Sequence, residues 1–421
     1  MNAGAPARPG LVAITWPLFT ELLLATCVAL AGLTLASRVS DAAAGAFVLS
    51  QHVWAAFFLL FRIVSMGASV VVTQQLGAGD RAGADQSARA ALGASLWLGV
   101  GTAATVALGA GVLLALLSTP PAVRTLAEPF LRLLALGLVL DAFNACMASV
   151  VRAHLHARDV LVNTIAMHTL HLLLCAPLMA AFGLPGFALA LLVSRSFGLA
   201  FHLWLWRRRL NLVPKARDWW TLRGRRLAPM LHIGLPGAAE NVAWRIIFIV
   251  TVSFAAGFGE KALATHGYTI QLQNFLLLFA LATGFASEIL VGHMIGAGDL
   301  HGANRLVRRS LRIGLTVSTG LALAAALAGP RLMRHFTADA QIVRDAATLL
   351  WLAVLVEPGR VFNIVFVNAL RATGDARFPV AAGVLSMVLV LGGGAWLLGA
   401  HLGLGSRACG SPTRPTSGCA G

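Results

Sequence analysis

Long apolar runs make up most of the chain, and each is near or above the ~20 residues that a membrane-spanning helix needs. The runs are rich in Leu and Ala and lack the alternation of a barrel strand, which favours helices. In the first half, this pattern predicts six spans, at residues 14–36, 45–73, 91–117, 130–151, 161–183 and 185–206. In the second half it predicts five more, at residues 233–257, 262–292, 309–329, 345–370 and 378–400. The predicted fold class is therefore an all-α polytopic membrane protein with about 11 transmembrane helices.

The segment Gly77-Ala78-Gly79-Asp80 returns as Gly296-Ala297-Gly298-Asp299, and positions 77 and 296 lie 219 residues apart. The same offset relates several further pairs, namely Pro17 and Pro236, Glu21 and Glu240, Asn144 and Asn363, Arg152 and Arg371, and Arg158 and Arg377. A repeat of this size indicates two copies of one half-protein joined head to tail. We expect two six-helix lobes packed as an inverted V, an architecture typical of transporters.

The predicted domains follow this repeat. The first lobe covers residues 1–206, a basic linker covers 207–229, the second lobe covers 230–403, and a tail covers 404–421. The repeat places a sixth span of the second lobe from about residue 404, but the tail contains no apolar run. We expect this tail to be disordered, and our hypothesis is that a truncation or an out-of-frame ending removed the twelfth helix. A truncated, inactive transporter is therefore one alternative.

Composition agrees with a membrane location, because 58% of the residues are hydrophobic, 11% are charged and mean hydropathy is +0.80. The net charge of +16 does not indicate nucleic-acid binding. With the amino terminus inside, the inner loops carry 19 Lys and Arg residues, Arg152 and Arg371 among them, and the outer loops seven, which is the positive-inside pattern. We expect a monomer in the bacterial inner membrane, with a cytoplasmic amino terminus and contacts to membrane lipid. The linker is either a site for anionic lipid or a plain cytoplasmic connection.

Charged side chains inside predicted spans are the candidate functional residues, because burying a charge in a bilayer is costly. Glu21 and Glu240 are equivalent carboxylates in the first span of each lobe, and we predict that they face each other across a central cleft. A carboxylate in such a cleft can exchange a proton for a cationic substrate. The alternative is that both accept hydrogen bonds from helix ends next to Pro17 and Pro236.

The remaining candidates lie in other spans. Asp141 is a further candidate coupling residue, while Glu357 and Arg360 share a helix face and are expected to form an ion pair. The secondary candidates are Arg62, Arg245, Gln271, Asn274 and Glu288, the last expected close to the inner surface.

Enzymatic and metal chemistry is not indicated. No clustered catalytic carboxylates or histidines and no metal-ligand spacing occur. His168 and His171 are interpreted as hydrogen-bonded or interfacial side chains, with a proton relay as the alternative. The repeated Gly-Ala-Gly-Asp lacks the Lys-Ser/Thr of a phosphate loop and is interpreted as a helix break. We therefore expect no catalytic residues, no metal and no cofactor, with H⁺ or Na⁺ as the coupling ion.

Several blocks resemble the multidrug and toxic compound extrusion (MATE) family. They are Trp16 to Leu22, Ser37 to Asp41, Gln75 to Asp80, Glu357 to Arg360 with Asn363, and Arg371 to Asp375 with Phe378-Pro379. The resemblance implies a twelve-helix exporter of organic cations, drugs or amphipathic metabolites that is driven by H⁺ or Na⁺ and works by alternating access. A lipid-linked precursor flippase of the same superfamily is the nearest alternative.

Two departures from the family bear on the coupling ion. Many members carry an aspartate in the first helix where this chain has Gly32, and the acidic position of some second lobes falls on Arg360, whose repeat mate is Asp141. A sodium site at those positions is not expected, and proton coupling through Glu21, Glu240 and Asp141 is favoured.

Overall fold

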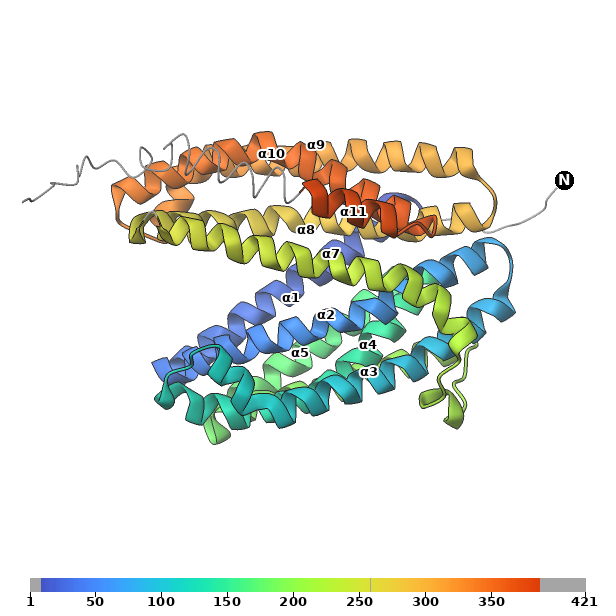
Figure 1. Ribbon diagram of the computed structural model, residues 1–421, viewed down its shortest axis with the longest axis horizontal. Coiled ribbons are helices and arrows are strands. Elements are labelled where there is room, and N and C mark those ends of the chain that lie inside the picture. The colour runs from blue at the N-terminus through green and yellow to red at the C-terminus, as the bar shows by residue number, and fades with distance from the viewer. Residues whose placement is uncertain (1–8, 258, 387–421) are drawn as a thin grey trace, which may run out of the picture. The chain divides into compact units, whose positions relative to one another are not determined.

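The computed structural model describes residues 9–257 and 259–386, which fold into long helices joined by short turns (Figure 1). The helices are α1 (Leu11–Val39), α2 (Asp41–Gly77), α3 (Arg81–Leu116), α4 (Pro121–Ala153), α5 (Ala157–Phe182), α6 (Leu184–Arg209), the 3₁₀ turn η1 (Ala216–Trp219), α7 (Gly224–Gly257), α8 (Glu260–Gly296), α9 (Leu300–Arg334), α10 (Ala340–Ala372) and α11 (Arg377–Ser386). Within the described residues, 10 helices are long and apolar enough to cross a membrane. The predicted all-α membrane fold is confirmed.

Helix boundaries differ from the prediction mainly at polar ends. Helices α3 and α9 begin well before residues 91 and 309, because each starts directly after a capping aspartate. Asp80 Oδ1 accepts a hydrogen bond from the Gly83 amide at 2.8 Å, and Asp299 Oδ1 accepts one from the Gly302 amide at 2.7 Å. Gly79 and Gly298 have φ values of +79° and +73°, which glycine adopts without steric cost. The repeated Gly-Ala-Gly-Asp is therefore a helix break, as interpreted.

The predicted linker is an ordered connection that is shorter than expected, because α6 continues to Arg209 and α7 begins at Gly224. Asp218 is buried and organises it: its carboxylate lies 2.5 Å from Arg223 Nη2 and accepts the Lys215 amide at 2.8 Å. Trp97 of α3 donates to the Trp220 carbonyl oxygen at 2.8 Å. The predicted span at 378–400 is described only as far as α11 extends, and the predicted tail at 404–421 lies outside the described residues.

The described chain forms two compact units. The first comprises the described residues up to Ala238, together with Leu278–Ile313 and Asn363–Arg377. It contains all of α1 to α6, the first parts of α7 and α9 and the last parts of α8 and α10. The second comprises Ala239–Leu277, Gly314–Phe362 and the described residues from Phe378 onward. This grouping by compactness differs from a division at the repeat boundary, because the ends of α8 and α10 pack on helices of the first repeat.

Apolar burial holds the first unit together. Its largest core cluster joins α1 to α6, and Phe47, Phe130 and Phe187 meet in it with ring centroids 5.0–6.2 Å apart. Close helix contacts rely on glycine. A Cβ atom on Gly67 of α2 would overlap the Met230 carbonyl of α7, and one on Gly234 of α7 would overlap the Ile63 carbonyl of α2.

This contact predicts that Gly234→Ala destabilises the protein, because α2 and α7 must separate to admit the methyl group. We expect a loss of about 1–3 kcal/mol, typical of overpacking. Thermal unfolding in detergent, followed by the reactivity of the buried thiols of Cys146 and Cys175, measures it. Gly320→Ala in α9 is the matched control, since its Cβ would have nothing within 4 Å. Equal unfolding temperatures for the two variants would contradict the assignment.

Candidate functional site

A cavity of about 530 Å³ lies within the first unit. Its walls come from α1, α2, α4, α5 and α6 and from the end of α8. The volume falls in the range of small-molecule sites. Three carboxylates and three arginines line it, namely Glu21, Asp141, Glu288, Arg62, Arg152 and Arg195. The cavity is therefore rich in charge although it is built from apolar helices.

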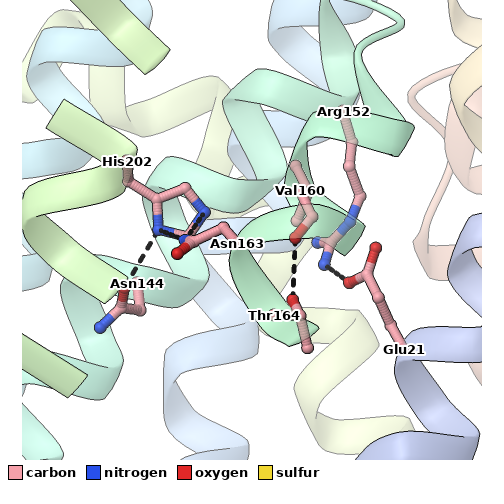
Figure 2. Close-up of polar contacts among 7 residues, drawn as sticks. All are labelled: Glu21, Asn144, Arg152, Val160, Asn163, Thr164 and His202. Carbon is pink, nitrogen blue, oxygen red and sulfur yellow. Dashed lines mark hydrogen bonds and ion pairs between the residues drawn. The ribbon is translucent and has the colours of Figure 1, made fainter. Parts of the chain in front are cut away.

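Glu21 and Arg152 form the first ion pair of the cavity. Figure 2 shows Arg152 reaching from α4 to the Glu21 carboxylate on α1, where Arg152 Nη2 donates to Glu21 Oε2. Glu21 is only 8% exposed, and its Oε1 atom has no hydrogen-bond partner among the described residues. Pro17, inside α1, precedes Glu21 by one helical turn and removes a backbone hydrogen bond there. This carboxylate is buried, held by one arginine and next to a weakened point of its helix.

Asp141 and Arg195 form the second pair. Asp141 lies on α4 and is 4% exposed, and its Oδ1 atom is 2.8 Å from Arg195 Nε of α6. Arg195 Nη1 also lies 3.0 Å from the Met167 sulfur of α5. A charge pair at this depth is tolerated because each partner neutralises the other.

A hydrogen-bonded cluster of Asn144, Asn163 and His202 lies among the same helices (Figure 2). His202 Nδ1 is 3.0 Å from Asn144 Oδ1, and Asn163 Nδ2 is 3.0 Å from His202 Nδ1. Asn144 Nδ2 also donates to the Arg195 carbonyl oxygen at 3.0 Å. All three side chains are buried, so the cluster ties α4, α5 and α6 together.

A third pair joins Glu288 of the cavity wall on α8 to Arg371 on α10. Glu288 Oε2 lies 3.4 Å from Arg371 Nη1, and Arg371 Nη1 donates to Asn368 Oδ1 at 3.2 Å. Glu288 is buried, at 5% exposure, with Arg371 beside its carboxylate, and its expected place near the inner surface stays a prediction. Arg62 of α2 lies over the Phe285 ring at 5.2 Å.

Aromatic side chains supply the apolar wall, among them Trp54, Phe58 and Phe187. His168 and His171, interpreted from the sequence as hydrogen-bonded or interfacial side chains, also line the cavity, and the His171 ring lies edge-on to Phe187 at 4.9 Å. A Cβ on Gly32 would lie 2.9 Å from ring carbons of Phe187 and Phe47. The place where many family members carry an aspartate is thus filled by aromatic rings.

The second unit holds the other predicted residues. Arg360 Nη1 lies 3.3 Å from Glu357 Oε2, which confirms the expected ion pair on α10. Arg360 Nη2 is also 3.4 Å from the amide oxygen of Gln273, a residue that the sequence did not single out. Of the remaining candidates, Glu240 and Gln271 are half-buried, whereas Arg245 and Asn274 are exposed. The predicted facing of Glu21 and Glu240 stays a prediction, because they lie in different units.

Sequence reasoning misplaced two arginines. Arg152 and Arg371 were counted with the inner loops, but they lie in the last turns of α4 and α10 and hold the buried carboxylates Glu21 and Glu288. Their equivalence in the 219-residue repeat was a signal that they share a role. His202 and Asn163 carried no comparable signal, because buried polar residues of one helix find their partners only through packing.

Within the described residues, no group of three or more His, Cys, Asp or Glu side chains is placed to hold a metal ion. Each of the three cavity carboxylates is paired with an arginine instead.

Comparisons with known proteins agree with this architecture. The family described as MatE matches residues 17–176 and 236–396. The chain is 27% identical over 403 residues to the uncharacterized transporter YisQ of Bacillus subtilis, covering 94% of this chain and 88% of that protein. It is 26% identical over 411 residues to the probable multidrug resistance protein NorM of Rhodopseudomonas palustris, covering 93% and 85%.

Solved structures share the fold. An outward-facing multidrug resistance MATE family transporter of the MOP superfamily gives a TM-score of 0.87 at 21% identity, covering 95% of this chain and 90% of that one. A MOP superfamily transporter from Pyrococcus furiosus, described as having a binding pocket of reverse polarity, gives 0.86 at 20% identity, covering 96% and 91%.

The Asp141–Arg195 pair predicts a non-additive mutant cycle. Arg195→Met leaves a buried carboxylate without its cation and should cost about 3–5 kcal/mol, whereas adding Asp141→Asn should recover most of that loss. Thermal unfolding of the two single variants and the double variant in detergent measures the coupling. Additive losses would show that the two side chains do not interact.

Proposed function

Because this chain belongs to the MatE family of transporters, we propose that it exports amphipathic small molecules, including organic cations, in exchange for protons. Family membership makes it a multi-pass membrane transporter related to multidrug efflux proteins, a class that moves small molecules rather than transforming them. The exchanged ion and the cargo are our inference from the cavity of the first unit.

One observation carries the proposal: a buried carboxylate, Glu21, is held by a single arginine in the wall of a cavity of small-molecule size. A proton on Glu21 removes the negative charge that balances Arg152. The cavity then holds an excess of positive charge and disfavours a cation. Loss of the proton restores the balance and allows a cation to bind. Proton and cargo therefore exclude each other, which is the requirement for exchange.

Asp141 extends the same logic. It is also buried against one arginine, and the Asn144–His202–Asn163 cluster connects its surroundings to α5 and α6. Neutralising Asp141 would change the environment of Arg195 and, through the Arg195 backbone, of Asn144. We propose that Glu21 is the primary proton site and that Asp141 adjusts the charge of the cavity. Glu240, the repeat mate of Glu21, keeps an analogous role in the second unit.

The side chains that line the cavity fit coupling to protons better than coupling to sodium ions. A sodium ion requires several oxygen ligands, whereas the cavity carboxylates are engaged by arginines. The position of the familiar first-helix aspartate is Gly32, with aromatic rings packed against it. The equal numbers of carboxylates and arginines also favour a small amphipathic cargo over a pyrophosphate-bearing lipid, which would need a strongly cationic site.

We also propose that the protein is a monomer in the bacterial inner membrane and that its amino terminus lies in the cytoplasm. The exposed Arg207, Arg208, Lys215 and Arg217 would then face the cytoplasm, as the distribution of basic residues favours. Trp220, 55% exposed beside them, suits the lipid headgroup level.

The proposal predicts that Glu21→Gln abolishes proton-driven export. In proteoliposomes with ethidium as the probe, a pH gradient should drive transport in the wild type and a sodium gradient alone should not. Glu21→Gln should lower the proton-driven rate by at least about tenfold, because the exchangeable proton is gone. Asp141→Asn should lower it less.

The matched control is Glu128→Gln. Glu128 lies on α4 like Asp141 but pairs with Arg132 at 2.6 Å outside the cavity, so its loss should leave transport near the wild-type rate. Transport that follows the sodium gradient, or a Glu21→Gln protein with full proton-driven activity, would refute the proposal. Translocation of a lipid-linked precursor across the membrane, without ethidium export, would favour the alternative function as a flippase.

A further inference from the structure

Helices α2 and α8 touch through their backbones near their carboxyl-terminal ends. A Cβ atom on Gly77 of α2 would overlap the carbonyl oxygen of His293, and one on Gly296 of α8 would overlap the carbonyl oxygen of Gln74. A Cβ on Gly292 would overlap the Thr73 hydroxyl. The two helices are therefore in direct contact, with no room for a side chain or a water molecule at the crossing.

Two long side chains fasten the same ends to the neighbouring helices. Gln74 Nε2 donates to the carbonyl oxygen of Ala372, the last residue of α10, at 2.8 Å. His293 Nε2 lies 2.7 Å from the carbonyl oxygen of Ala153, the last residue of α4. A carbonyl oxygen only accepts, so this histidine nitrogen carries the hydrogen. We call these two hydrogen bonds the clasp.

The clasp follows the internal repeat. Gln74 and His293 are equivalent positions 219 residues apart, and so are Ala153 and Ala372, and Gly77 and Gly296. Each bond therefore runs from α2 or α8 of one repeat to the end of α4 or α10 of the other. Such reciprocal bonds tie the two repeats together at the end of the molecule where the Gly-Ala-Gly-Asp turns lie.

The clasp also adjoins the ion pairs of the cavity. Ala153 follows Arg152, which holds Glu21, and Ala372 follows Arg371, which holds Glu288. The carbonyl groups that accept the clasp bonds are thus fixed by the same helix ends that present the two arginines. A change in the charge of Glu21 or Glu288 therefore acts, through its arginine, on a helix end that accepts a clasp hydrogen bond.

We propose that Gln74 and His293 are the positioning residues of a gate that closes the cavity toward the membrane surface bearing the Gly-Ala-Gly-Asp turns. The proposal rests on alternating access within the function proposed above, since a cavity that opens to both surfaces in turn needs a seal that can form and break. Two hydrogen bonds and a glycine contact form such a seal. Together they hold the helix ends firmly, but each hydrogen bond alone is weak enough to break.

The test measures access to the cavity and needs neither cargo nor gradient. Ser149, buried in the cavity wall on α4, is replaced by cysteine in a protein whose native cysteines are removed. A membrane-impermeant cationic thiol reagent is then added from either side, using right-side-out and inverted vesicles. Gln74→Ala should raise the labelling rate from the gate side about fivefold, the effect of one hydrogen bond, and Gln74→Ala with His293→Ala at least about tenfold.

The exchange variant is the matched control. Gln74→His combined with His293→Gln keeps a donor at both repeat-related positions, so its labelling should stay within about twofold of the parent. If the double alanine variant does not fold, the labelling rate of Gln74→Ala alone tests the gate. Unchanged labelling from the gate side, or an equal increase from both sides, would overturn the gate. Because labelling is independent of transport, this outcome is separate from any failure of proton-driven export.

Discussion

The pairing of buried carboxylates with arginines is the constraint on which the described cavity depends. Glu21, Asp141 and Glu288 lie at 8%, 4% and 5% exposure, and each would be costly to bury as an isolated charge. Arg152, Arg195 and Arg371 make the burial tolerable and also join α1 to α4, α4 to α6 and α8 to α10. Removing the charge of one carboxylate therefore alters both the electrostatics of the cavity and a contact between helices.

This coupling of charge and contact suits a transporter. Surface ion pairs contribute little to stability, but a buried pair whose partner is lost becomes strongly unfavourable. A proton is the smallest agent that removes a carboxylate charge, and in the function proposed above it acts on carboxylates held by arginines at helix ends that also contribute the clasp. Because of the repeat, both α4 and α10 end with an equivalent arginine. Each of these arginines holds a buried carboxylate, but the carboxylate is a different one in each half.

Much of this architecture follows from the sequence, because apolar run length and a 219-residue repeat are visible without coordinates. The helix breaks at Gly79 and Gly298 and the Glu357–Arg360 pair were also predictable, since both are local in sequence. The partners of Glu21 and Asp141 were not, because Arg152 and Arg195 approach from other helices. An arginine in the last turn of a helix looks like a loop residue until packing shows which way its side chain extends.

The polar cluster and the clasp were not predictable from the sequence for the same reason. Asn163, His202 and His293 are ordinary polar residues in apolar helices, and only the crossing of those helices gives them partners. Gly32 is a contrasting case: its departure from the family pattern was evident in the sequence, but the reason, two phenylalanine rings packed against it, was not.

The central claim is that proton and cargo exclude each other at Glu21. The most direct measurement is the number of protons released when ethidium binds to the purified protein, obtained by calorimetry in buffers of different ionisation enthalpy. The account predicts proton release on binding to the wild type, increasing as the pH is lowered toward the range where Glu21 is protonated, and little or none with Glu21→Gln. Binding of ethidium with no proton release at any pH would contradict it.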